Sequence, residues 1–179
     1  ARIETMGYAA EAIASYATFA QLKADGVIPS SVRFQVSILS AIALAAGFFE
    51  MPEHAAVELI IEAALAHEVK KIAAAIPHDQ LAVQWDVCHE VVAADGGMPL
   101  QYDDVLTGSI ARVTRLLGFG PDDVEAGIHL CSRRGSRDES QPVTRASSVK
   151  TDNTIHEWLS SHRSTQETSS LAGSTRWLN

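Results

Sequence analysis

The stretch LAVQWDV, residues 81–87, decides the fold of this chain. It is short, apolar and rich in β-branched and aromatic residues, and the breaker IPHDQ at 76–80 precedes it, so it predicts a buried β-strand. Side chains alternate along a strand, which places Gln84, Asp86 and, on an extended backbone, Cys88 on one face. Burying an Asp is costly unless something pairs with it, so Asp86 is the first candidate functional residue.

The regions on either side repeat the same pattern of helix and strand. Two further strands are predicted, and the connecting helices are long enough for right-handed crossovers between parallel strands. The order α, β, α, β, α, β predicts an α/β architecture. The expected helices cover 6–25, 52–75 and 104–117, with a short helix or loop at 41–49, and the flanking strands cover 32–38 and 124–131. His89 and Glu90 are expected in solvent, on the loop after the central strand.

Composition excludes several classes of protein. The 179 residues carry a net charge of −8, which argues against a nucleic-acid surface. The longest apolar stretch, from Ser37 to Phe49, is too short to span a membrane. Two cysteines, Cys88 and Cys131, do not make a disulfide framework and favour a reducing compartment. We therefore expect a soluble, cytoplasmic protein. The polar residues at the strand ends, described below, point to a small-molecule substrate.

The chain changes character after Cys131. Residues 1–131 carry the predicted strands and helices, whereas residues 132–179 are rich in Ser, Thr and Arg and lack apolar periodicity. The second part is typical of disordered chain. We expect one α/β domain at 1–131 followed by a disordered tail at 132–179.

Polar side chains gather where the predicted strands end. Parallel neighbours would bring Asp86, Cys88, His129 and Cys131 together at the carboxyl edge of the sheet, where α/β proteins bind their ligands. A His-x-Cys pair on one strand face offers an imidazole nitrogen and a thiolate to zinc. The alternatives are a hydrogen-bonded core His beside an inert buried Cys, and an Asp86 that caps a turn or pairs with an Arg.

Three stretches resemble successive strand regions of the C-terminal domain of cobalamin-independent methionine synthase. They are YATFAQLKADGVIPSSVRFQVSI at 16–38, IPHDQLAVQWDVCHEV at 76–91 and GIHLC at 127–131. The family belongs to the superfamily of uroporphyrinogen decarboxylase, and its fold is the TIM barrel. In methionine synthase the His-x-Cys strand supplies two zinc ligands, and zinc activates the homocysteine thiol that takes a methyl group from a folate.

The resemblance implies specific roles for residues of this chain. His129 and Cys131 match the two zinc ligands. Asp86 matches the residue that holds the amino-acid substrate, and Gln84 lies beside it on the same face. Cys88 would add a third zinc ligand only by departing from the family, where this position is not a ligand. The implied cofactor is zinc and the implied methyl donor is a folate.

This chain also departs from the family. The remaining ligands, a glutamate and a second cysteine, lie downstream of the His-x-Cys strand in the family and are not found here. A complete (β/α)₈ barrel takes about 250 residues, so we expect a partial barrel of about three parallel strands in a truncated chain of doubtful activity. Two alternatives remain open: a metal-independent barrel related to uroporphyrinogen decarboxylase that uses Asp86 alone, and an inactive chain.

An open three-stranded segment has two unpaired edges. We expect the Val, Phe and Trp positions of the strands to face the uncovered interior of the barrel. On that basis the sequence predicts marginal stability and self-association through the exposed strands.

Overall fold

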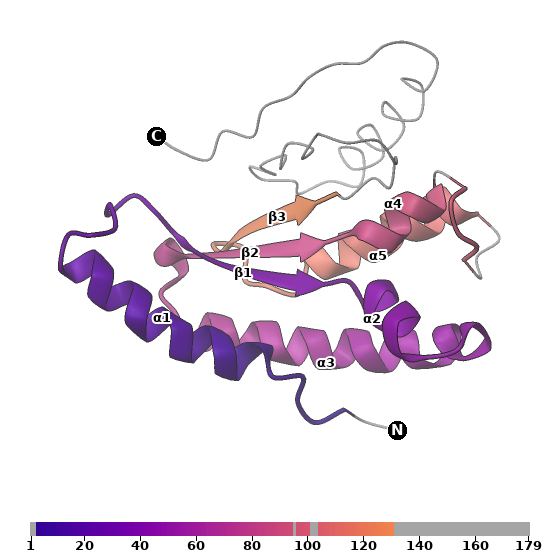
Figure 1. Cartoon of the computed structure of the whole chain (residues 1–179), viewed down its shortest axis with the longest axis horizontal. Helices are drawn as coiled ribbons and strands as arrows, with labels where there is room; N and C mark the ends of the chain where they lie inside the picture. Colours follow the sequence, from indigo (N-terminus) through magenta and orange to yellow (C-terminus); the bar gives the residue numbers. More distant parts are fainter. Residues whose placement is uncertain (1–2, 95, 101–103, 131–179) are drawn as a thin grey trace, which may run out of the picture.

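A computed structural model describes residues 3–94, 96–100 and 104–130 of this chain. Within them lies a three-stranded parallel sheet in the order β1-β2-β3, covered by helices (Figure 1). The mixed α/β class, the parallel strands and their sequential order are as predicted. The predicted tail at 132–179, together with Cys131, lies outside the described residues.

The elements alternate along the chain as the sequence pattern indicates, with two short 3₁₀ turns between them. The strands are β1 (Phe34–Leu39), β2 (Leu81–Asp86) and β3 (Glu125–His129). The helices are α1 (Tyr8–Ala24), α2 (Ala41–Phe48), α3 (His54–Ala75), α4 (Cys88–Ala94) and α5 (Val105–Leu117), and the 3₁₀ turns are η1 (Met51–Glu53) and η2 (His78–Gln80).

Capping residues fix where two of the helices begin. The Ser40 hydroxyl accepts a hydrogen bond from the Ala43 N–H at 3.2 Å and so caps α2. Asp104 caps α5 by accepting from the N–H groups of Leu106 and Thr107. Residues 41–49, for which the sequence allowed a short helix or a loop, contain the helix α2.

The prediction for the residues after β2 is wrong. A loop was expected there, but Cys88 begins α4 and the strand ends at Asp86. The polypeptide turns into a helix immediately after Val87, so Cys88 does not continue the alternation of the strand. Gln84 and Asp86 share a face as predicted, and Cys88 does not join them.

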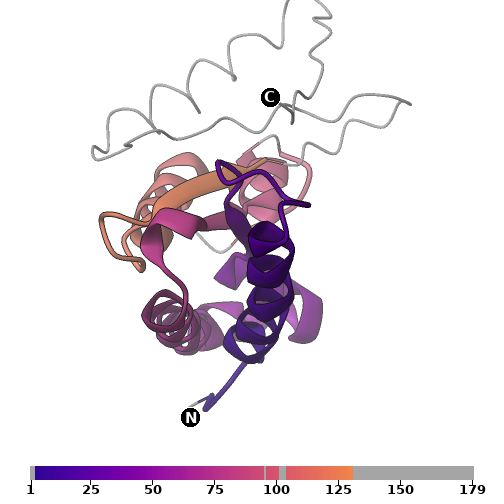
Figure 2. The ribbon, with the colours of Figure 1, turned by 90° about the vertical axis from the view of Figure 1, so that its left-hand side faces the viewer.

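The apolar side of the sheet faces the helices and not an open interior. Val36, Val83 and Trp85 are buried in one core cluster with apolar side chains of α1, α3 and α5. Figure 2, turned by 90° from the view of Figure 1, shows α1 and α3 beneath the strands. The expectation that Val, Phe and Trp face the uncovered side is thus wrong, because the alternation runs the other way.

The side of the sheet that none of the described helices covers, called the uncovered side below, is polar. Gln35 and Ser37 on β1 are exposed, and Gln84 and Asp86 on β2 are half-buried. Such a face is solvated without a covering layer, so the three strands do not require an apolar partner on that side. In the part of the chain that the structure describes, no helix is long and apolar enough to cross a membrane.

Candidate functional site

The candidate site lies where β2 and β3 end on the uncovered side of the sheet. Asp86 is the register partner of His129 across these two parallel strands. The backbone holds the corner together, because the Val87 N–H donates to the His129 carbonyl at 2.9 Å and the Ser40 N–H donates to the Asp86 carbonyl at 3.2 Å. The sequence predicted this juxtaposition correctly for both side chains.

A ladder of amides and hydroxyls leads along the sheet to Asp86. The Gln84 amide nitrogen donates to Asp86 Oδ1 at 3.0 Å and lies 3.3 Å from the Ser37 hydroxyl. Its carbonyl oxygen accepts from the Gln35 amide at 3.1 Å across β1 and β2. Gln84 therefore orients the Asp86 carboxylate.

Small residues flank this ladder on the same face. Ser37 pairs in register with Gln84, which in turn pairs with Gly127 of β3. A Cβ added at Gly127 would meet no atom within 4 Å, so the sheet surface beside Gln84 is open space. At the opposite end of the face Arg33 forms an ion pair with Glu125 at 3.3 Å. The carboxyl end is thus the part of this face that offers both a carboxylate and an imidazole.

Only one of the two metal ligands predicted from the sequence lies within the described residues. His129 lies at the site, while Cys131 lies outside the described residues. Cys88 is half-buried at the start of α4 and does not share the face of Asp86. Across residues 3–94, 96–100 and 104–130, no three His, Cys, Asp or Glu side chains come close enough together to hold a metal ion.

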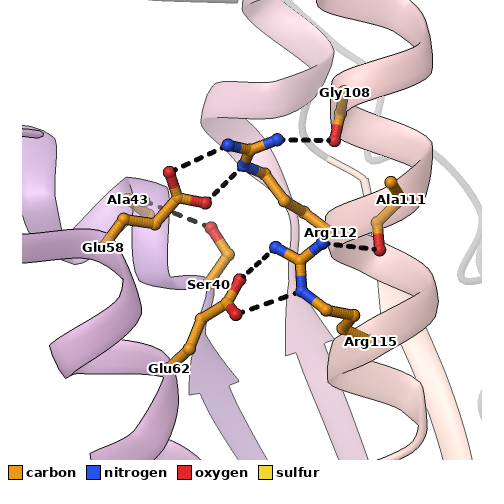
Figure 3. Close-up of polar contacts among 8 residues, drawn as sticks. All are labelled: Ser40, Ala43, Glu58, Glu62, Gly108, Ala111, Arg112 and Arg115. Atoms are coloured by element: carbon orange, nitrogen blue, oxygen red, sulfur yellow. Dashed lines mark hydrogen bonds and ion pairs between the residues drawn. The ribbon is translucent and has the colours of Figure 1, made fainter. Parts of the chain in front are cut away.

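Behind the strand ends lies a buried polar layer that the sequence analysis missed (Figure 3). Arg112 on α5 binds both carboxylate oxygens of Glu58 on α3, and also the Gly108 carbonyl at 3.1 Å. One turn along, Arg115 binds both oxygens of Glu62 at 3.1 and 2.7 Å. Glu58 and Glu62 are 5% and 7% exposed, so these bidentate ion pairs join the two helices inside the protein.

A sequence signal for this layer exists. Glu58 and Glu62 are four residues apart, and Arg112 and Arg115 are three apart, so each pair lies on one face of its helix. Opposite charges on two helices flanking the same strand predict a contact between them. The expected solvent exposure of Glu90 is wrong, because this side chain is 2% exposed within the same layer.

Comparisons with protein-family models, with curated proteins and with solved structures found no match to this chain.

Proposed function

We propose that this chain is a segment of a methionine-synthase-like (β/α)₈ barrel, and that its carboxyl edge binds an amino-acid thiol for methyl transfer. The observation that supports the proposal is the pairing of Asp86 with His129, in register and on the uncovered side of the sheet. The resemblance assigns the amino-acid substrate to Asp86 and a zinc ligand to His129. The folate donor remains an implication of the resemblance.

The chemistry of Asp86 suits the ammonium group of an amino acid. Gln84 holds the Oδ1 atom of the carboxylate in place, so a ligand ammonium group would bind at Oδ2. A charge-assisted hydrogen bond of this kind is stronger than one between neutral groups. Because Gln84 is itself fixed by Gln35, the carboxylate is oriented before a ligand arrives, which reduces the entropic cost of binding.

Zinc fits the described residues incompletely. His129 would supply one imidazole nitrogen and Cys131 a thiolate, but a catalytic zinc usually has three protein ligands. When bound, zinc would lower the pKa of a substrate thiol and so favour the nucleophilic thiolate. The chain's own contribution to the reaction is to hold the amino acid at Asp86 with its thiol directed toward His129.

Two binding measurements on the full chain test the proposal. Titration calorimetry with homocysteine should detect binding, and Asp86→Asn should weaken it by about 10- to 100-fold because the ion pair is lost. Asp79→Asn, which changes a carboxylate in η2 before β2, is the matched control and should bind as the wild type does. Equal affinity for homocysteine in the wild type and Asp86→Asn would contradict the proposed role.

The metal is tested separately by equilibrium dialysis with zinc and metal analysis. Wild-type protein should retain zinc, and His129→Ala should lose it. The control His67→Ala removes an exposed imidazole from α3 and should leave retention unchanged. Homocysteine binding that survives a chelator and the His129→Ala substitution would instead favour the metal-independent alternative.

A further inference from the structure

Glu90 is a buried carboxylate with an unusual environment. It lies in the first turn of α4 and is 2% exposed. Within the described part of the chain, neither of its carboxylate oxygens makes a hydrogen bond of normal geometry. A buried acceptor left in this way costs free energy, and an ionised one costs much more. The arrangement therefore suits the neutral, protonated form of the side chain.

Polar groups from three other parts of the fold act on Glu90. Ser40 approaches from the start of α2, Glu58 from α3 and Arg112 from α5. Both oxygens of Glu58 already engage Arg112, as Figure 3 shows, so the positive charge nearest to Glu90 is bound to a second carboxylate. The Ser40 hydroxyl accepts from the Ala43 N–H while it caps α2.

These surroundings alter the proton affinity of Glu90. Burial raises its pKa from the ordinary 4.5 to about 6, and the negative charge of Glu58 adds to this. The Ser40 hydroxyl, the backbone N–H of Glu90 itself and the charge of Arg112 act in the opposite direction and limit the rise. Next to Glu90 on α4, burial and the charge of His54 lower the pKa of His89.

We propose that α4 is a proton-controlled element: with Glu90 neutral it packs as in the structure, and ionisation of Glu90 loosens it from α2 and α5. The element adjoins the candidate site, because Val87 alone separates α4 from Asp86. The Ser40 N–H also donates to the Asp86 carbonyl, so the cap of α2 and the end of β2 are linked. The inference does not depend on the proposed function.

The sign of the pH dependence follows from the elevated pKa. The packed state binds the proton more tightly than an open state in which Glu90 has its ordinary value of 4.5. Packing is therefore firmest below 4.5 and weakens as the pH rises through about 6. The corresponding rise in the opening equilibrium constant is about 30-fold, because the shift of the pKa is about 1.5 units.

Amide hydrogen exchange on the full chain tests this prediction. Protection factors, corrected for the intrinsic pH dependence of exchange, are measured for the last turn of α4 and for the Gly97 N–H, which donates to the Val92 carbonyl. In the wild type they should fall by about 30-fold between pH values well below 4.5 and pH values well above 6. Glu90→Gln, which is isosteric and cannot ionise, should abolish the fall. Glu50→Gln, an exposed control, should behave as the wild type does.

Two further variants keep the test decisive. His89 titrates with the opposite sign, because a lowered pKa makes its neutral, packed form more stable as the pH rises. His89→Asn should therefore retain the fall. Ser40→Ala removes a group that lowers the pKa of Glu90, so it should move the midpoint of the fall to higher pH. Protection that is independent of pH in the wild type, or an unchanged fall in Glu90→Gln, would overturn the proposal.

Discussion

Glu68 is a single residue that holds two helices together. Its carboxylate, on α3 and 1% exposed, accepts hydrogen bonds from the Ala9 N–H at 2.6 Å and from the Met6 N–H and Thr5 hydroxyl at 3.1 Å each. These donors are at or just before the start of α1, whose own cap residue, Gly7, has no side chain to accept them. A carboxylate at this position also interacts favourably with the helix dipole.

We expect Glu68→Ala to lower the free energy of unfolding by about 2 to 3 kcal/mol, because it leaves buried donors unsatisfied. Urea denaturation followed by circular dichroism measures the loss. Glu11→Ala, which removes an exposed acidic residue from the first turn of α1, should cost less than about 1 kcal/mol. Equal losses in the two variants would contradict the capping role of Glu68.

The same residue predicts acid sensitivity. Burial by itself raises the pKa of Glu68, but the hydrogen bonds it accepts and the charge of Lys71 outweigh burial and lower it below 4.5. Its stabilising contribution is therefore complete above 4.5 and is lost as the pH falls through the lowered value. The difference in stability between the wild type and Glu68→Gln should thus shrink in acid, which urea denaturation at a series of pH values measures.

The positions of single residues were predicted correctly where a short-range rule applies. Asp86 and His129 were predicted to meet because the alternation of a strand and the parallel pairing of neighbours fix both positions. The burial of Glu90 was not predicted, because it depends on three helices that converge from distant parts of the sequence. No local pattern around HEVV distinguishes such a residue from one in solvent.

At the scale of the elements, two bidentate ion pairs connect α3 to α5. A buried charge left without its partner destabilises a protein by about 3 to 5 kcal/mol, whereas replacing the whole pair by apolar residues is often neutral. We expect Arg112→Met to cost about 3 kcal/mol, because Glu58 is left buried beside Glu90. Glu58→Leu combined with Arg112→Met should restore stability to within about 1 kcal/mol of the wild type.

A double-mutant cycle measured by urea denaturation tests this, with single and double variants compared in one buffer. A coupling free energy near zero would mean that the two side chains act independently, contrary to the geometry. The pair of Glu62 and Arg115 is the internal comparison. Arg115 is 44% exposed, against 21% for Arg112, so its cycle should give the smaller coupling.

A second element contact, between η2 and the turn before β3, depends on a protonated histidine. His78 Nδ1 lies 2.8 Å from the Asp123 carboxylate and Nε2 lies 3.0 Å from the Ala73 carbonyl. Both partners are acceptors, so only the imidazolium satisfies both contacts. The hydrogen bond to Asp123 raises the pKa of His78 above its ordinary 6.5.

The stabilising effect of this contact is therefore complete below 6.5 and is lost as the pH rises through the elevated value. We expect Asp123→Asn to lower the midpoint of thermal unfolding in mildly acidic buffer and to have little effect in alkaline buffer. Glu50→Gln, which changes an exposed carboxylate, is the control. A direct check is the pKa of His78 by NMR, which should fall in Asp123→Asn.

At the scale of the whole molecule, one core cluster includes residues from α1 through Val124, just before β3. The sequence predicted only part of this core, because Ile61, Leu65 and Val69 of α3 recur at the helical period on one face. It did not reveal which side of the sheet the core lies on, since both faces of β2 carry some apolar residues. Only the contacts of Trp85 with Phe119 and the helices decide that.

The polar uncovered face changes what is expected of self-association. An apolar face would associate through its surface, but here Gln35, Ser37 and Gln84 are already hydrogen-bonded to one another. The described sheet ends at β1 and β3, and an edge strand pairs readily with another chain through its backbone groups. Any association of this chain should therefore proceed through strand edges and not through the face.

This predicts the behaviour of a charged substitution on β1. A lysine on an edge strand opposes pairing with a second sheet, so Ser37→Lys should shift the chain toward the monomer in sedimentation equilibrium. Ser15→Lys, on the exposed surface of α1, adds the same charge away from the sheet and should sediment as the wild type does. If both variants dissociate equally, net charge and not strand pairing controls association. If the wild type is monomeric at every concentration, the expectation of self-association is wrong. Solvation of the polar face and protection of the strand edges would then be enough to keep the chain monomeric.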